Sequence, residues 1–139
     1  MAAYEAWLTL ARSALWFVRV RAGQELSFHA GQREVDAVLL QLLTGPGNTA
    51  VVARTADALL RSRSRAALRV FASAWTMAGP PQAAQLSAAL GGALREAARV
   101  PEEARRFTAD VRRLLTDEDE RVRRGAALLV DRVTAALPQ

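Results

Sequence analysis

The apolar residues of this chain recur with the period of an α-helix almost from end to end, and no segment alternates apolar and polar residues as a β-strand would. The first segment illustrates the spacing with Tyr4, Trp7, Leu8, Ala11, Leu15 and Val18. Comparable stripes follow within residues 35–43, 52–59, 68–75, 86–94, 107–115 and 122–137. We therefore expect an all-α protein of about seven amphipathic helices.

Turn-forming residues divide these helices. A polar break is expected at residues 24–32, and the segments Gly45-Pro46-Gly47-Asn48 and Gly79-Pro80-Pro81 have the composition of turns. Pro101 suits the first turn of a helix. A Gly91-Gly92 pair in the fifth segment either bends the helix or allows close approach of a neighbouring helix, and we favour close approach. Because the connections are short, we expect consecutive helices to pack as antiparallel hairpins in one domain, residues 1–139.

Composition excludes several kinds of chemistry. The chain has no Cys, so it holds neither a disulfide nor a thiol nucleophile. All 19 basic residues are Arg, which rules out a lysine Schiff base or a phosphate-loop lysine. No run approaches the ~20 apolar residues of a membrane span, and the start lacks the basic lead of a signal peptide. We expect a cytoplasmic, soluble protein that does not enter membranes.

One stretch carries a family resemblance. Leu114-Leu115-Thr116 is followed by an acidic turn, then by Val122-Arg123 and by Ala and Leu at helical spacing. Over residues 104–137 this resembles the turn and second helix of a HEAT-type repeat. Residues 42–59 resemble it more weakly, which leaves room for one divergent hairpin at residues 64–98. The resemblance implies a HEAT-like α-solenoid of stacked hairpins, and an irregular helical bundle is the alternative.

The residues offer little for catalysis. His29 is the only histidine, so no multi-histidine metal site can form, and no nucleophile elbow or glycine-rich phosphate loop is present. We expect a protein that is not an enzyme, with no catalytic residues, no metal, no cofactor and no small-molecule substrate.

The acidic run at residues 117–120 lacks the alternating ligands of a calcium loop. We interpret it as a helix start. The expected contacts are pairs across one helical turn, Asp117–Arg121, Asp119–Arg123 and Glu120–Arg124.

A basic region spans residues 54–69. It contains five arginines against Asp57 alone, namely Arg54, Arg61, Arg63, Arg65 and Arg69. Residues 56–65 faintly resemble the core of a helix-turn-helix, although Leu60 occupies the position that usually holds Gly. The region therefore suggests nucleic-acid binding, through bases or phosphates, and the alternative is a solvated basic corner.

Trp16 is the most unusual residue of the first segment. In a continuous helix it falls on the polar face, between Arg12 and Arg19. It is then either covered by a later segment that includes Phe28, or exposed as part of a partner-binding surface with both arginines. Trp75, by contrast, is expected to face the core.

These features together favour a non-catalytic protein-interaction or scaffold module, a class that includes inhibitor- and immunity-type binders. The expected partner is another protein or a second copy of the chain. Nucleic-acid binding through the basic region is the alternative.

Overall fold

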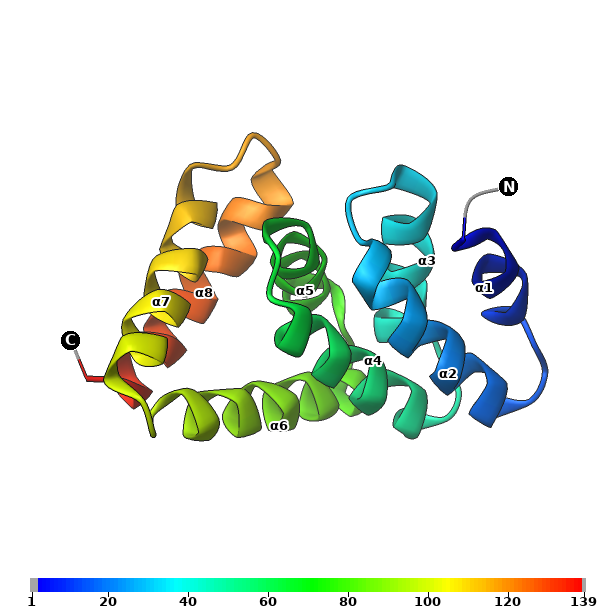
Figure 1. Ribbon diagram of the computed structural model, residues 1–139, viewed down its shortest axis with the longest axis horizontal. Helices are drawn as coiled ribbons and strands as arrows, with labels where there is room; N and C mark the ends of the chain where they lie inside the picture. Colours follow the sequence, from blue (N-terminus) through cyan, green and yellow to red (C-terminus); the bar gives the residue numbers. More distant parts are fainter. Residues whose placement is uncertain (1–2, 139) are drawn as a thin grey trace.

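The computed structural model describes residues 3–138, and within them the chain is all-α, with no β-strand. Eight α-helices and two short 3₁₀ turns follow one another (Figure 1). The α-helices are α1 Glu5–Leu10, α2 Trp16–Leu26, α3 Arg33–Thr44, α4 Thr49–Ser62, α5 Arg65–Met77, α6 Pro80–Ala97, α7 Pro101–Arg112 and α8 Glu120–Ala136. The 3₁₀ turns are Ser27–His29 and Arg113–Thr116.

Local capping explains most of these boundaries. The side chain of Asn48 accepts a hydrogen bond from the Ala50 N–H, and Ser64 accepts one from the Ala67 N–H. Pro80 and Pro101 begin α6 and α7, where the missing N–H costs nothing.

The first predicted helix is broken in two. The Ser13 hydroxyl accepts a hydrogen bond from the Leu15 N–H, and the Ser13 carbonyl accepts one from Arg19 Nη1 at 2.8 Å. These contacts replace helical hydrogen bonds and divide α1 from α2. The predicted break at residues 24–32 begins later, because α2 runs through Gly23 to Leu26.

Helices two or three places apart in the chain lie side by side. One row consists of α2, α4 and α6, and a second row joins α3, α5 and α8 (Figure 1). The pairs α3–α4 and α7–α8 pack as expected of hairpins, whereas α5 and α6 make little contact. Ala78 and Gly79 are both extended and redirect the chain between these two helices, so the predicted hairpin at residues 64–98 does not form.

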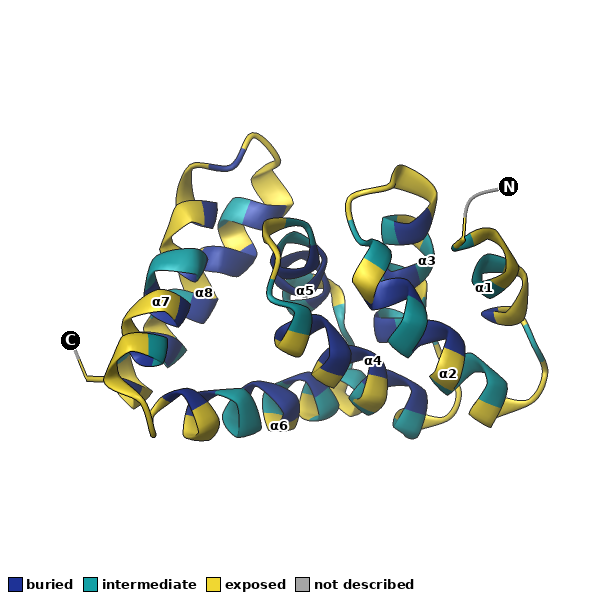
Figure 2. Cartoon of the chain, in the orientation of Figure 1, coloured by how far each residue is buried: buried dark blue, intermediate teal, exposed yellow. Residues whose placement is uncertain are grey.

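A contiguous hydrophobic core runs between the two rows, and exposed residues concentrate on outward faces and turns (Figure 2). The tightest contact joins α5 and α8, where a Cβ on Gly125 would overlap the backbone carbonyl of Ala72. Among the described residues no other helix packs closely against Gly91 or Gly92, and the nearest atoms belong to the flexible side chain of Arg95, so the expected close approach does not occur there.

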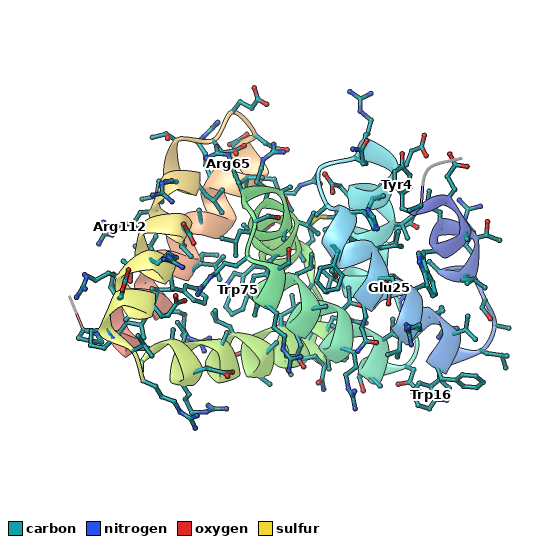
Figure 3. The ribbon with its side chains drawn as sticks, in the orientation of Figure 1. Tyr4, Trp16, Glu25, Arg65, Trp75 and Arg112 are labelled. Atoms are coloured by element: carbon teal, nitrogen blue, oxygen red, sulfur yellow. The ribbon has the colours of Figure 1, made fainter. Side chains whose placement is uncertain are left out.

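Trp75 is only partly buried. It packs against Phe71, with ring centroids 5.9 Å apart, and the guanidinium of Arg132 lies over its indole at 5.6 Å. Figure 3 shows its side chain on the side of α5 that faces α8. Trp75 thus joins the core as predicted, but at its edge.

Candidate interaction surface

The turn between α1 and α2 presents three consecutive large apolar residues to solvent. Leu15, Trp16 and Phe17 are 53%, 47% and 56% exposed, and the indole of Trp16 contacts the ring of Phe17 edge-on. Successive residues of a helix point about 100° apart, so the three side chains point in different directions from the start of α2. We call these three residues the aromatic corner; Figure 3 shows Trp16 at the outer end of α2.

The prediction that a later segment covers Trp16 is wrong. Phe28, the residue expected to cover it, is itself 70% exposed. The exposure of Trp16 arises from the break at Ser13, which makes Trp16 the first residue of α2. The sequence instead predicts one continuous helix, in which exposure of Trp16 would result from its position on the polar face, between Arg12 and Arg19.

Arg12 and Arg19 border a groove beside this corner. Two adjoining depressions, of about 380 Å³ and about 460 Å³, share Arg12, Val38 and Gln41 in their linings, and we describe them together as one groove. We call it the α1–α3 groove. Its apolar walls come from α1, α3 and the start of α4, through Leu8, Val38, Leu42, Val51 and Val52.

The two arginines are available for further contacts. Within residues 3–138 neither Arg12 nor Arg19 forms an ion pair, and the Arg19 side chain donates only to the Ser13 carbonyl. Glu34 is the one acidic residue among the described residues that line the groove. Arg21, by contrast, pairs with Glu25 at 3.1 Å and lies over the Trp7 ring.

The five arginines of the predicted basic region fall into two groups in the structure, three that form ion pairs and two that do not. Arg63 pairs with Glu103 at 2.6 Å and lies over the Phe107 ring, and therefore ties the end of α4 to α7. Arg65 and Arg69 both bind Asp117, in the turn before α8 (Figure 3 labels Arg65). Three of the five arginines thus hold the structure together.

Arg54 and Arg61 remain exposed on α4. They lie seven residues apart and so share a helix face, with the exposed Asp57 between them, and neither arginine has an ion pair in the described part of the chain. A further groove of about 460 Å³ adjoins Arg61, between α4, α6 and α7. Its charged lining combines both signs, with Arg61 and Arg63 beside Asp57, Glu96 and Glu103.

The contact between Asp117 and α5 is a structural contact that sequence reasoning missed. Asp117 is 3% exposed and reaches α5, whereas the predicted i,i+4 partner was Arg121. Burial raises the pKa of this carboxyl, but hydrogen bonds from the Asp119 N–H and the Arg69 guanidinium outweigh it and hold the pKa below its usual value. The same contact raises the pKa of Arg69.

The other two predicted pairs of the acidic run are also absent from the described residues. Asp119 instead caps α8 by accepting the Arg121 N–H, and Arg123 donates to the Asp117 carbonyl. No sequence signal within one helical turn could have indicated Arg69, which lies 48 residues away.

The only histidine of the sequence lies in the 3₁₀ turn after α2. His29 lies against the Tyr4 ring, with centroids 5.8 Å apart. In the described residues, no group of three or more His, Asp or Glu side chains is arranged to hold a metal ion. None of the described helices has the length and apolar character needed to cross a membrane.

Comparison with known proteins adds no relative: no family model, curated protein or solved structure matches this chain.

Proposed function

We propose that this protein is a non-catalytic interaction module that binds another protein, or a second copy of itself, through the aromatic corner and the adjoining arginines. The observation that carries the proposal is the joint exposure of Leu15, Trp16 and Phe17 beside Arg12 and Arg19. Trp and Arg are enriched among the residues that dominate binding energy at interfaces. Exposed apolar clusters on small proteins commonly mark such interfaces.

The Trp16→Ala variant tests this role. Because the indole is half exposed and α2 is anchored elsewhere, we expect the melting temperature to stay nearly unchanged. Association should weaken by about 2 kcal/mol or more, as at an interface hot spot. Sedimentation velocity of the purified chain checks self-association, and co-purification from its own cells at low salt checks a partner.

Phe28→Ala is the matched control, since Phe28 is an exposed aromatic residue at the opposite end of α2. It should leave association intact. A Trp16→Ala variant that melts far below the parent, or that associates as the parent does, would contradict the proposal.

A second candidate function is nucleic-acid binding, supported by the exposed pair Arg54 and Arg61 on one face of α4. Phosphate contacts release counterions, so binding should weaken steeply with added salt. Replacing both arginines with Gln should lower the salt slope by about one unit per lost phosphate contact.

Fluorescence anisotropy with short DNA and RNA duplexes measures this slope. Arg63→Gln is an informative comparison, because that guanidinium is held by Glu103 and should matter for stability more than for binding. An absence of binding at low ionic strength would eliminate this candidate.

A further inference from the structure

The α1–α3 groove combines an apolar lining with guanidinium groups that have no acidic partner. Arg12 stands where its two lobes meet, and Arg19 borders the lobe next to the aromatic corner. An arginine beside apolar surface binds a carboxylate strongly, because the charge-assisted hydrogen bonds form where water is partly excluded. The groove therefore favours a ligand that is both apolar and acidic.

The floor of the groove is an uncovered helix face. Glu34, Val38 and Gln41 lie on α3 at intervals of four and three residues, together with the exposed Ala37. Glu34, Ala37 and Gln41 are exposed, Val38 is half-buried, and α1 contributes one wall through Leu8 and Thr9. A stripe at this spacing, flanked by apolar walls, matches the way a groove receives an amphipathic helix.

We propose that the α1–α3 groove binds an acidic amphipathic helix of the partner protein, with its carboxylates on Arg12 and Arg19 and its apolar face on Val38 and Leu42. This inference rests on the proposed interaction function and adds the chemistry of the partner. The aromatic corner then packs against the end of the bound helix or the partner surface beyond it.

A membrane surface suits this site less well. A bilayer can receive the projecting aromatic corner, but its plane cannot follow a concave groove between α1 and α3. Arg12 and Arg19 border that groove. A protein segment reaches both the groove and the corner.

Selection from a library of random peptides tests the proposal, with peptides long enough for about four helical turns (~15 residues). The full chain should enrich peptides that carry Asp or Glu together with large apolar residues at three- and four-residue spacing. Arg12→Gln should weaken the selected peptides roughly tenfold or more, because a charged hydrogen bond is lost. The Arg12 guanidinium forms no hydrogen bond or ion pair within residues 3–138, so this variant should fold normally.

Ala37→Glu provides an independent variant. Ala37 is exposed on the groove floor, so a carboxylate there should repel acidic peptides while the protein stays folded. Ala37→Arg should instead keep or improve binding. Arg124→Gln, at an exposed arginine on α8, is the control and should have no effect.

The negative results distinguish an error in the groove assignment from an error in the proposed interaction function. Enriched peptides that are basic or uncharged, a failure to enrich any peptide, or equal binding by the Arg12→Gln chain would overturn the groove assignment. If natural association still depends on Trp16 in that case, the interaction function stands without the groove. Flotation with phosphatidylcholine vesicles containing phosphatidylglycerol, lost on Arg12→Gln, would assign the site to lipid and also overturn the proposal.

Discussion

At the scale of single residues, Asp117 is the most consequential side chain outside the interaction surface. Its carboxylate is buried, yet its partners Arg65 and Arg69 remain partly exposed to water. The ion pairs therefore serve mainly to satisfy a carboxylate that the fold has removed from solvent. Loss of its charge should cost stability even though no apolar contact changes.

We predict that Asp117→Asn lowers the free energy of unfolding at pH 7 by about 1–3 kcal/mol. The folded pKa of Asp117 is lowered, so its contribution is fully present above the unfolded value of about 3.9 and disappears as pH falls through the folded pKa. The parent and the variant should therefore converge in strong acid. Urea denaturation across this pH range measures the difference, with the exposed Glu118→Gln as control.

At the scale of elements, the distance between α5 and α8 depends on a glycine, Gly125. The glycines of α6, Gly91 and Gly92, set no such distance to a neighbouring helix. A Cβ at Gly125 would overlap the carbonyl oxygen of Ala72, so the two helices would have to separate. At Gly91 the nearest atom is the mobile end of Arg95, 3.4 Å away. The same substitution should therefore have opposite effects in the two helices.

Gly125→Ala should destabilise the protein by roughly 1–3 kcal/mol through overpacking. Gly91→Ala and Gly92→Ala should each stabilise it by about 0.5–1 kcal/mol, because Ala loses less backbone entropy in a helix. Chemical denaturation of the three variants measures these changes. If Gly125→Ala were also stabilising, the close packing of α5 on α8 would be incorrect.

Most element boundaries were predictable because their causes are local. Pro101 begins α7 as expected, and Asn48 and Ser64 likewise act within a turn of the helices that they cap. The break at Ser13 was missed because its hydroxyl competes with helical hydrogen bonds that the apolar period favours.

The candidate site was harder to predict. Trp16, Arg12 and Arg19 could be named from the sequence, but the groove that the two arginines border depends on how α1 packs beside α3. The pairing of Arg69 with Asp117 is likewise a property of the tertiary fold. The HEAT-type resemblance stays a prediction, since the α3–α4 and α7–α8 pairs fit it and the α5–α6 connection does not.

At the scale of the whole molecule, the contiguous core couples the two rows of helices. Trp75 lies at its edge and bridges Phe71 on α5 to Arg132 on α8. We predict that Trp75→Ala costs about 2–3 kcal/mol, near the low end for a core aromatic residue because it is only partly buried. Far-ultraviolet circular dichroism should report one cooperative transition in both proteins. Separate transitions would show that the rows unfold independently.

The packing of α5 on α8 also bears on how the protein is synthesised. About 60 residues separate the end of α5 from the end of α8. A ribosome adds ~5–20 residues per second, so several seconds pass before the covering helix emerges. During that interval the nascent chain displays the α5 face that α8 later covers, which makes a chaperone that shields apolar segments most useful at this stage of translation.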